Sequence, residues 1–447
     1  MNREKGQALP LTLLILAVGT LVITPFLTHA SSSLTGSRVY GQSLTEMYSC
    51  DAGMEHAIWY LSKGDLASQL PEPGDNVTYQ LGEAINGLTP TITVTANTTS
   101  EGGTPGEITD TVIDTYDFGD YGAEPATIIP VSGNIYAIAY TDWDNDGWVK
   151  TLEIATNGDI TDTPIDSLEF DTKKGQWADI THVYGDIYAI AYRGEKNDGF
   201  LKTIEIAPNG SITDSVIDTI EFDTKNCIYP DIIRIASDIC AIAYQVNKAD
   251  GFLKTVEIAS NGQITDTVID SLEFDTSNGR EPDIIHIASD IYAIAYRGNN
   301  KDGYLKTVEI ASDGEISNTA VDTFEFNPYE CYFPDITHIA GDIYALAYAG
   351  ASPPNDDWWG GVLTTVEIAS DGDITDSTVD EIMFDTDSGE FPDIIQVSGG
   401  IFGIAYTGPG YDGFLKTVEI AADGSITDVI LDTLEFDNRV GYCPSII

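Results

Sequence analysis

Three aspartates in one short run could hold a cation. Asp142, Asp144 and Asp146 alternate with other residues in the run 142–147, which ends in glycine. This spacing places three carboxylates around one hard cation, as in calcium loops. Glu153 stands at the twelfth position of the run, but every repeat of the chain carries a glutamate there, which indicates a strand residue. The run predicts weak calcium binding, and an acidic turn without a metal is the alternative.

A second set of residues could bind a ligand through aromatic faces. These residues depart from an internal repeat, and exposed aromatic rings beside polar groups suit a ring-shaped or extended ligand. The run 353–359 lies in a loop that is six residues longer than its equivalents, so it is a candidate for specificity. The alternative is that the aromatics fill gaps between structural units. The candidate ligand-binding residues are Trp143, Trp177, Arg193, Tyr229, Arg297, Tyr332, Trp358, Trp359 and Phe391, and Phe333 and Tyr442 share their connecting segments.

Signatures of hydrolytic and phosphate chemistry are missing from the sequence. No Ser-His-Asp elbow, phosphate-binding loop or HExxH run occurs. Carboxylates recur at equal spacing, as at Asp162, Asp214 and Asp266, so we expect turn and strand-edge residues instead of a catalytic pair. No catalytic residue is predicted, and binding is favoured over catalysis.

An internal repeat must position these side chains. The tag AIAY, with the variants ALAY and GIAY, recurs every 52 residues except for a last step of 58 residues. A period of about 50 residues is typical of propellers and arrays. The tags begin at Ala137, Ala189, Ala241, Ala293, Ala345 and Gly403.

Each repeat predicts four strands. The runs 282–287, 291–296, 304–310 and 264–274 illustrate the first to fourth strands. Two turns per repeat contain Ser-Asp or Gly-Asp and Asn-Gly or Asp-Gly pairs, which favour hairpins, whereas a parallel β-helix would not. Four-stranded meanders joined by longer crossovers predict a mainly β protein, a β-propeller over 107–447. In such a blade the loop between strands two and three shares one face with the crossover, so the aromatic candidates should share that face.

The predicted strands do not divide evenly into blades. A lone fourth strand at 107–118 precedes six complete repeats, and 444–447 opens another first strand. We expect six complete blades and a split seventh blade that lacks its second and third strands. A six-bladed ring with spare strands at both ends is the alternative.

The N-terminus predicts a membrane helix. Residues 8–30 are apolar and long enough to cross a bilayer. Arg3 and Lys5 precede this run, so the positive end should stay cytoplasmic and the rest of the chain should lie outside. A secretory signal that ends at Ala30 is the alternative.

The leader resembles that of type IV pilin-like proteins. The charged leader ends with Gly6, and the apolar run begins directly after it with Gln7-Ala8-Leu9. The segment 47–57 is similar to the A-x-D-A-G-x-E-x-A stretch of minor pilins. The resemblance covers 1–63. It implies cleavage after Gly6, a membrane helix that continues as a stalk, and partners in pilus or secretion-type assembly machinery. Leu11 departs from the pattern, because pilins usually carry glutamate there.

The sequence thus predicts three parts and a cell-surface function. The leader, helix and stalk occupy 1–63, a small β appendage or linker occupies 64–106, with a Thr-rich strand at 89–99, and the propeller follows. The net charge of −52 makes nucleic acid a poor partner. We expect a single-pass membrane protein whose extracytoplasmic propeller binds or adheres to an extracellular glycan or protein. A surface polysaccharide hydrolase or lyase that uses the propeller mouth is the alternative.

Overall fold

The computed structural model describes residues 76–80, 91–95, 104–118, 125–246, 250–351, 360–439 and 441–447. They belong to two compact units that divide between Thr104 and Pro105. The predicted leader, membrane helix and stalk at 1–63, including Gly6 and Gln7, lie outside these residues. Within the segments described, no helix combines the length and the apolar character needed to cross a membrane.

The N-terminal unit contains one described hairpin. Strand β1 (Asn76–Gln80) pairs antiparallel with β2 (Thr91–Thr95), and β2 lies inside the Thr-rich run for which a strand is predicted.

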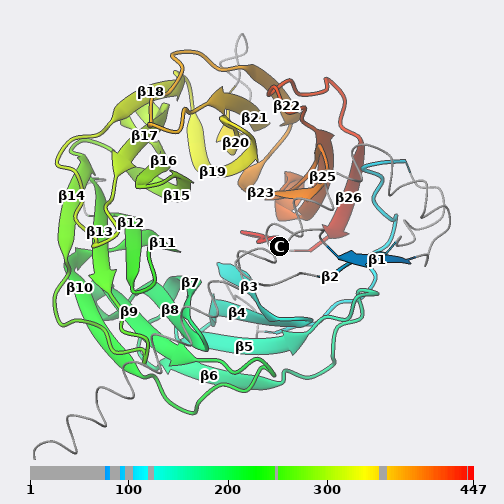
Figure 1. The fold of residues 1–447 in the computed structure, drawn as a ribbon. Helices are drawn as coiled ribbons and strands as arrows, with labels where there is room; N and C mark the ends of the chain where they lie inside the picture. Colours follow the sequence, from blue (N-terminus) through cyan, green and yellow to red (C-terminus); the bar gives the residue numbers. More distant parts are fainter. Residues whose placement is uncertain are drawn as a thin grey trace, which may run out of the picture. The chain divides into compact units, whose positions relative to one another are not determined.

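The second unit is a propeller of six four-stranded antiparallel sheets, which we number as blades 1 to 6 (Figure 1). Blades 1 to 3 contain β3 (Ala126–Ser132), β4 (Ile135–Thr141), β5 (Gly147–Glu153) and β6 (Asp166–Asp171); β7 (Gln176–Tyr184), β8 (Ile187–Arg193), β9 (Asp198–Glu205) and β10 (Asp218–Asn226); and β11 (Ile228–Arg234), β12 (Ile239–Gln245), β13 (Gly251–Glu257) and β14 (Asp270–Asp275).

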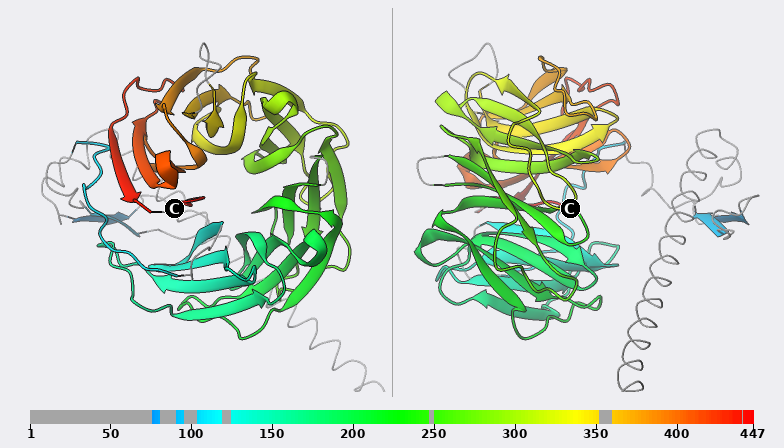
Figure 2. Two further views of the ribbon diagram at one scale, coloured as in Figure 1. Left: turned by 180° about the vertical axis from the view of Figure 1, so that it is seen from behind. Right: turned by 60° about the vertical axis from the view of Figure 1, so that its left-hand side comes forward.

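Blades 4 to 6 repeat the same meander, and the view from behind in Figure 2 shows the same order of blades around the ring. They contain β15 (Arg280–Ala288), β16 (Ile291–Arg297), β17 (Gly303–Glu309) and β18 (Asp322–Asn327); β19 (Cys331–Ala340), β20 (Ile343–Gly350), β21 (Gly360–Glu367) and β22 (Asp380–Asp385); and β23 (Glu390–Ser398), β24 (Ile401–Thr407), β25 (Gly413–Glu419) and β26 (Asp432–Asp437). Short 3-10 turns, η2 (Glu195–Asn197), η4 (Asn299–Lys301) and η5 (Pro409–Tyr411), join the second and third strands of blades 2, 4 and 6.

The AIAY tag forms the second strand of each blade and explains how the blades pack. Its alanines lie on one face of the strand, and its large side chains lie on the other. In the core between blades 1 and 2, Ala137 and Ala139 meet Tyr188, Ile190 and Tyr192. The same small-against-large contact recurs in the four following cores, so each core lies between two blades and the second strands are buried on both faces.

Aspartates link the blades at two radii. In the first strands, Asp179 Oδ2 accepts a hydrogen bond from the backbone N–H of Ile232 in the next blade at 2.8 Å. At the start of the fourth strands, Asp166 Oδ2 accepts from Ile212 N–H at 2.9 Å. The inner bond recurs at Asp231, Asp283 and Asp335, and the outer bond recurs at Asp218, Asp270, Asp322 and Asp380.

The two end segments of the propeller, 104–118 and 441–447, form no strand. A strand needs a hydrogen-bonded neighbour, and the described chain has no second and third strands of a further blade to pair with them. Both segments nevertheless bond to the blades: Ile108 N–H donates to Asp432 Oδ2 at 2.7 Å, and Ile446 N–H donates to Asp393 Oδ2 at 3.0 Å. The prediction of six complete blades is confirmed, whereas the strands predicted at 107–118 and 444–447 are absent.

The inner aspartates make stability depend on pH. Burial raises the pKa of Asp393 to about 6, from about 4 in an unfolded chain. A carboxyl with a raised pKa favours the folded state when it is protonated, so this contribution is lost as the pH rises through about 6. The change Asp393→Asn keeps an oxygen for the Ile446 amide and removes the ionisation.

We therefore expect the melting temperature of the Asp393→Asn variant to fall less than that of the wild type between pH 5 and pH 7.5, measured by differential scanning fluorimetry. The control is Asp385→Asn. Burial opposes ionisation of Asp385, but hydrogen bonds from Lys416 and Tyr406 outweigh it and lower the pKa of this carboxyl, so it titrates below this window. Equal slopes for wild type and Asp393→Asn would contradict the prediction.

Candidate functional site

A strained residue stands at the start of the first strand in five blades and in the C-terminal end segment. In blade 2 the pairing register shifts between Gln176 and Asp179, and Trp177 between them adopts a left-handed backbone conformation. Bulky residues rarely adopt this conformation, and such strain tends to cluster at functional sites. The equivalent residues are Trp177, Tyr229, Glu281, Phe333, Phe391 and Cys443, with φ between 48° and 51°.

Four of these residues and Tyr442 form a continuous aromatic cluster. The ring centroids of Trp177 and Tyr229 are 4.7 Å apart, and those of Tyr229 and Phe333 are 5.5 Å apart. Phe333 lies 3.8 Å from Phe391, which lies 4.6 Å from Tyr442. The cluster therefore joins blades 2, 3, 5 and 6 to the C-terminal end segment.

A cavity of about 440 Å³, the mouth pocket, lies beside the aromatic cluster. The β4–β5 loop borders it with Asp142, Trp143 and Asn145, and the start of β7, directly after the β6–β7 crossover, borders it with Gln176 and Trp177. Gln176 Nε2 donates to Asn145 Oδ1 at 2.5 Å and ties the loop to the crossover. The two kinds of connection thus share one face, as predicted. The remaining lining residues are Pro125, Thr141, Tyr229, Phe391, Tyr442 and Cys443.

The exposure of the lining aromatics makes the mouth pocket accessible. Trp143 is 71% exposed at its edge. Trp177, Tyr229 and Phe391 are half-buried, so each ring keeps part of its surface for a ligand. Burial, with the nearby charge of Glu281, raises the pKa of the Tyr229 hydroxyl, which therefore stays a neutral donor.

The two candidate arginines have different surroundings. The Arg193 guanidinium lies 4.8 Å from the Trp177 ring centroid, and its Nε is buried without a hydrogen-bond partner among the described residues. Arg193 also takes part in none of the ion pairs found in the described segments. A stacked guanidinium with spare donors suits an acceptor on a ligand.

Arg297 instead belongs to a buried ion pair. Its guanidinium lies 4.2 Å from the Tyr332 ring centroid and donates to Glu281 Oε1. Glu281 is 7% exposed, and its other carboxylate oxygen accepts from Phe333 N–H at 3.1 Å. Burial raises the pKa of Glu281, and the charge of Arg297 opposes this. Glu281 thus links Arg297 to the backbone of Phe333 in the aromatic cluster, and neither Arg297 nor Tyr332 lines the mouth pocket.

In the aspartate loop 142–147, hydrogen bonds already use one carboxylate. Asp142 Oδ1 accepts from the backbone N–H groups of Asp144 and Asp146 at 3.0 and 2.8 Å, and Oδ2 accepts from Trp148 Nε1 at 3.0 Å. Burial and the charges of Asp142 and Asp144 raise the pKa of Asp146. Among the residues with a described position, no three His, Cys, Asp or Glu side chains gather as metal ligands.

Sequence reasoning predicted the face but not every member of the site. It could not decide between the adjacent Tyr332 and Phe333, because the register shift before Asp335 determines which of the two enters the aromatic cluster. Gln176 and Cys443 carried no signal, since neither is aromatic or charged. Trp358 and Trp359 lie outside the described residues.

The fold and the site define a β-propeller with an aromatic mouth pocket, and Arg193 stacks on the lining residue Trp177 without lining the pocket itself. No described protein family matches the sequence, and no curated protein matches it.

Solved structures with a similar arrangement include Sqt1 from Chaetomium thermophilum, at 13% identity and a TM-score of 0.44, covering 71% of this chain and 74% of that one. A protein of unknown function from Dyadobacter fermentans has 10% identity and a TM-score of 0.43, covering 64% of this chain and 90% of its own. A mutant of AofleA from Arthrobotrys oligospora has 12% identity and a TM-score of 0.41, covering 70% and 87%.

Proposed function

We propose that this protein displays its propeller at the cell surface and binds an extracellular glycan or protein through the mouth pocket. The observation that carries the proposal is the meeting of Trp143, Trp177, Tyr229 and Phe391 around one cavity, with Arg193 stacked on Trp177. These residues are far apart in sequence, and the propeller brings them to one cavity.

The chemistry of the pocket favours a ring-shaped ligand with hydrogen-bond acceptors. The faces of Trp177 and Tyr229 can stack on the apolar side of a sugar ring or on an aromatic side chain. Arg193 offers donors to hydroxyl or carboxylate oxygens.

A surface polysaccharide hydrolase or lyase is the second candidate function. Burial raises the pKa values of Asp146 and Glu169, and neighbouring carboxylates add to the effect: Asp142 and Asp144 for Asp146, and Asp146 and Asp142 for Glu169. Two carboxyl groups with raised pKa values could act as acid and base. Neither carboxyl group lines the mouth pocket, so binding remains the first proposal.

The binding proposal predicts that aromatic truncation weakens the complex. A glycan and cell-surface screen on the full chain in mild detergent would identify a ligand. We expect Trp177→Ala to cost about 2 kcal/mol, roughly 30-fold in affinity, measured by calorimetry. We expect a similar loss for Trp358→Ala, in the lengthened loop.

The control for this experiment is Asp238→Asn, in the tight β11–β12 turn on the opposite face, which should bind as the wild type does. Binding that survives both tryptophan changes but fails in Asp238→Asn would place the site on the other face. Turnover of a polysaccharide in the same screen would favour the hydrolase or lyase.

We further propose that 1–63 anchors the propeller as a pilin-like leader, membrane helix and stalk, and that pilus-type machinery inserts the protein into a surface filament. The apolar run at 8–30 and the pilin-like leader support this. Mass spectrometry of the mature protein should find Gln7 at the N-terminus. A mature protein that begins at Ser31 would instead show a secreted product.

For the aspartate loop we propose weak calcium binding. The carboxylates of Asp144 and Asp146 and the remaining lone pairs of Asp142 would hold the ion, which would offset their mutual repulsion. Calcium that binds the folded state alone should raise the melting temperature, and Asp144→Asn should reduce that rise. Equal melting temperatures in calcium and in chelator would overturn the proposal.

A further inference from the structure

The contacts between successive blades follow one pattern of equivalent residues. A tyrosine in each second strand packs on a phenylalanine in the fourth strand of the preceding blade, as Tyr192 does on Phe170. In blades 2, 3, 4 and 6 a lysine of the third strand reaches the same phenylalanine, as when Lys202 Nζ donates to the carbonyl oxygen of Phe170 and to Asp171. In blade 5, Thr364 takes the place of this lysine. The ring centroids of the five such pairs between blades are 5.1 to 5.4 Å apart.

The N-terminal end segment takes part in this pattern as if it were a fourth strand. Tyr140 of blade 1 packs on Phe118 at 5.2 Å, and Lys150 donates to the Phe118 carbonyl oxygen. Asp114 Oδ2 accepts from Ile160 N–H at 2.8 Å, the outer bond described above. On its other side the segment receives a hydrogen bond from Thr417 of blade 6 at the Gly106 carbonyl oxygen.

The C-terminal end segment takes part as if it were a first strand. Ile446 N–H bonds to Asp393 of blade 6 as Ile232 N–H bonds to Asp179. Together the two end segments occupy the innermost and outermost strand positions of a seventh blade. The two strand positions between them form no sheet among the described residues.

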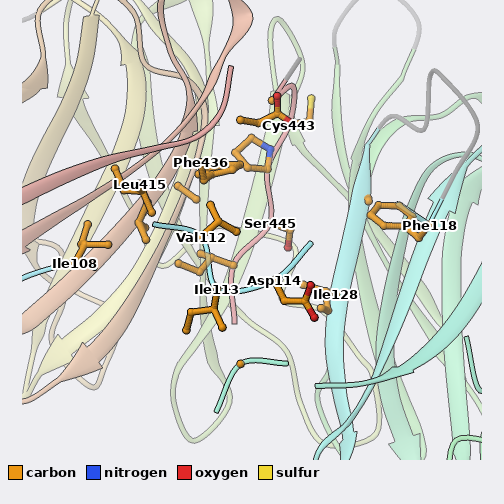
Figure 3. Close-up of a pocket in the computed structure, with 18 of the residues that line it drawn as sticks. Ile108, Val112, Ile113, Asp114, Phe118, Ile128, Leu415, Phe436, Cys443 and Ser445 are labelled. Atoms are coloured by element: carbon orange, nitrogen blue, oxygen red, sulfur yellow. The ribbon is translucent and has the colours of Figure 1, made fainter. Parts of the chain in front are cut away.

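A cavity of about 670 Å³, the slot, lies between blade 1 and blade 6 (Figure 3). Blade 1 contributes Ile128 and Ile138, and blade 6 contributes Ala405 from its small-residue face and Leu415. The end segments contribute Ile108, Val112, Ile113, Phe118, Cys443, Ser445 and Ile446. These walls are the same faces that form the five cores between neighbouring blades.

Phe436 shows what the slot lacks. Its five equivalents, Phe170, Phe222, Phe274, Phe326 and Phe384, are 2–4% exposed because a tyrosine of the next blade covers each one. Phe436 borders the slot and stays half-buried, and in the described part of the chain no tyrosine packs on its ring in this way. A seventh blade would supply that tyrosine.

We propose that the slot receives a β-hairpin of a partner polypeptide, which completes the propeller as a seventh blade. Continuity with the five established cores identifies the occupant: its first strand needs the alternation of large and small residues found in AIAY, with a tyrosine that covers Phe436. Its second strand needs a lysine that reaches the Phe436 carbonyl oxygen and a threonine that donates to the Gly158 carbonyl oxygen, as Thr151 donates to Gly210.

The hairpin pairs at both edges. Its first strand would run antiparallel beside 441–447, and its second would run antiparallel beside 107–118, as in the meander of every blade. This pairing would convert both end segments into strands, because each would gain the hydrogen-bonded neighbour that a strand requires. The partner thus adds two strands and the chain itself supplies the other two.

The test uses a labelled peptide with the sequence of residues 291–309, the second and third strands of blade 4. Added to the full chain in mild detergent, it should bind saturably by fluorescence anisotropy and raise the melting temperature by several degrees. A matched peptide with the changes Tyr296→Ala and Lys306→Ala lacks the contacts to Phe436 and should bind at least 10-fold more weakly.

Two exposed valines provide matched protein variants. Val112→Asp places a charge in the slot and should weaken the 291–309 peptide at least 10-fold, whereas Val429→Asp, outside the slot, should not change binding. Absence of binding, equal binding of the two peptides, or no effect of Val112→Asp would overturn the proposal. So would a hairpin that raises the melting temperature only when it is fused after Ile447, because that result would exclude a separate partner.

Discussion

The packing of a small face against a large face, repeated around the ring, is the interaction on which the rest of the structure depends. Alanines in the second strand of one blade let the tyrosines and isoleucine of the next blade approach closely, and the resulting cores lie between blades and not inside them. A single blade therefore has no core of its own, and each blade is stable only against its neighbours. The aspartate bonds at two radii then fix the rotation of one blade relative to the next.

The same constraint explains where this protein could bind partners. Inside the ring, contacts between blades use both faces of nearly every second strand, so little variation is tolerated there. The β4–β5 loop and the starts of the first strands lie outside these cores and can differ from blade to blade, which is where the aromatic cluster and the mouth pocket occur. Between blades 1 and 6, in contrast, two core-forming faces meet a cavity instead of a neighbour.

Many of the aspartate carboxylates are used in hydrogen bonds and ion pairs between blades and are therefore not free to bind a ligand. Outer aspartates such as Asp166 and Asp218 accept hydrogen bonds from backbone N–H groups. Asp171 and Asp223 accept hydrogen bonds from a lysine and a tyrosine of the next blade. Many of the negative charges therefore take part in contacts that hold the blades together. The basic side chains are few and most of those described are engaged: Lys202 and Lys254 serve the contacts between blades, and Arg297 pairs with Glu281. Arg193 takes part in no ion pair among the described residues, and its guanidinium stacks on Trp177 of the mouth pocket.

The sequence by itself determined the repeat and the six complete four-stranded blades, because hairpin turns and alternating strands are local patterns that recur in each copy. Of the aromatic candidates, the structure brings Trp143, Trp177, Tyr229 and Phe391 to one cavity. Only the tertiary structure decided that Phe333 and not Tyr332 enters the aromatic cluster, that Asp142 organises its own loop, and that Arg193 and Arg297 differ. Those outcomes depend on register shifts and on contacts between blades far apart in the chain. The N-terminal end segment shows most clearly what a sequence pattern cannot determine. Residues 107–118 have the sequence of a fourth strand, but a β-strand forms only beside a hydrogen-bonded neighbour, and the described chain contains no strand that pairs with them.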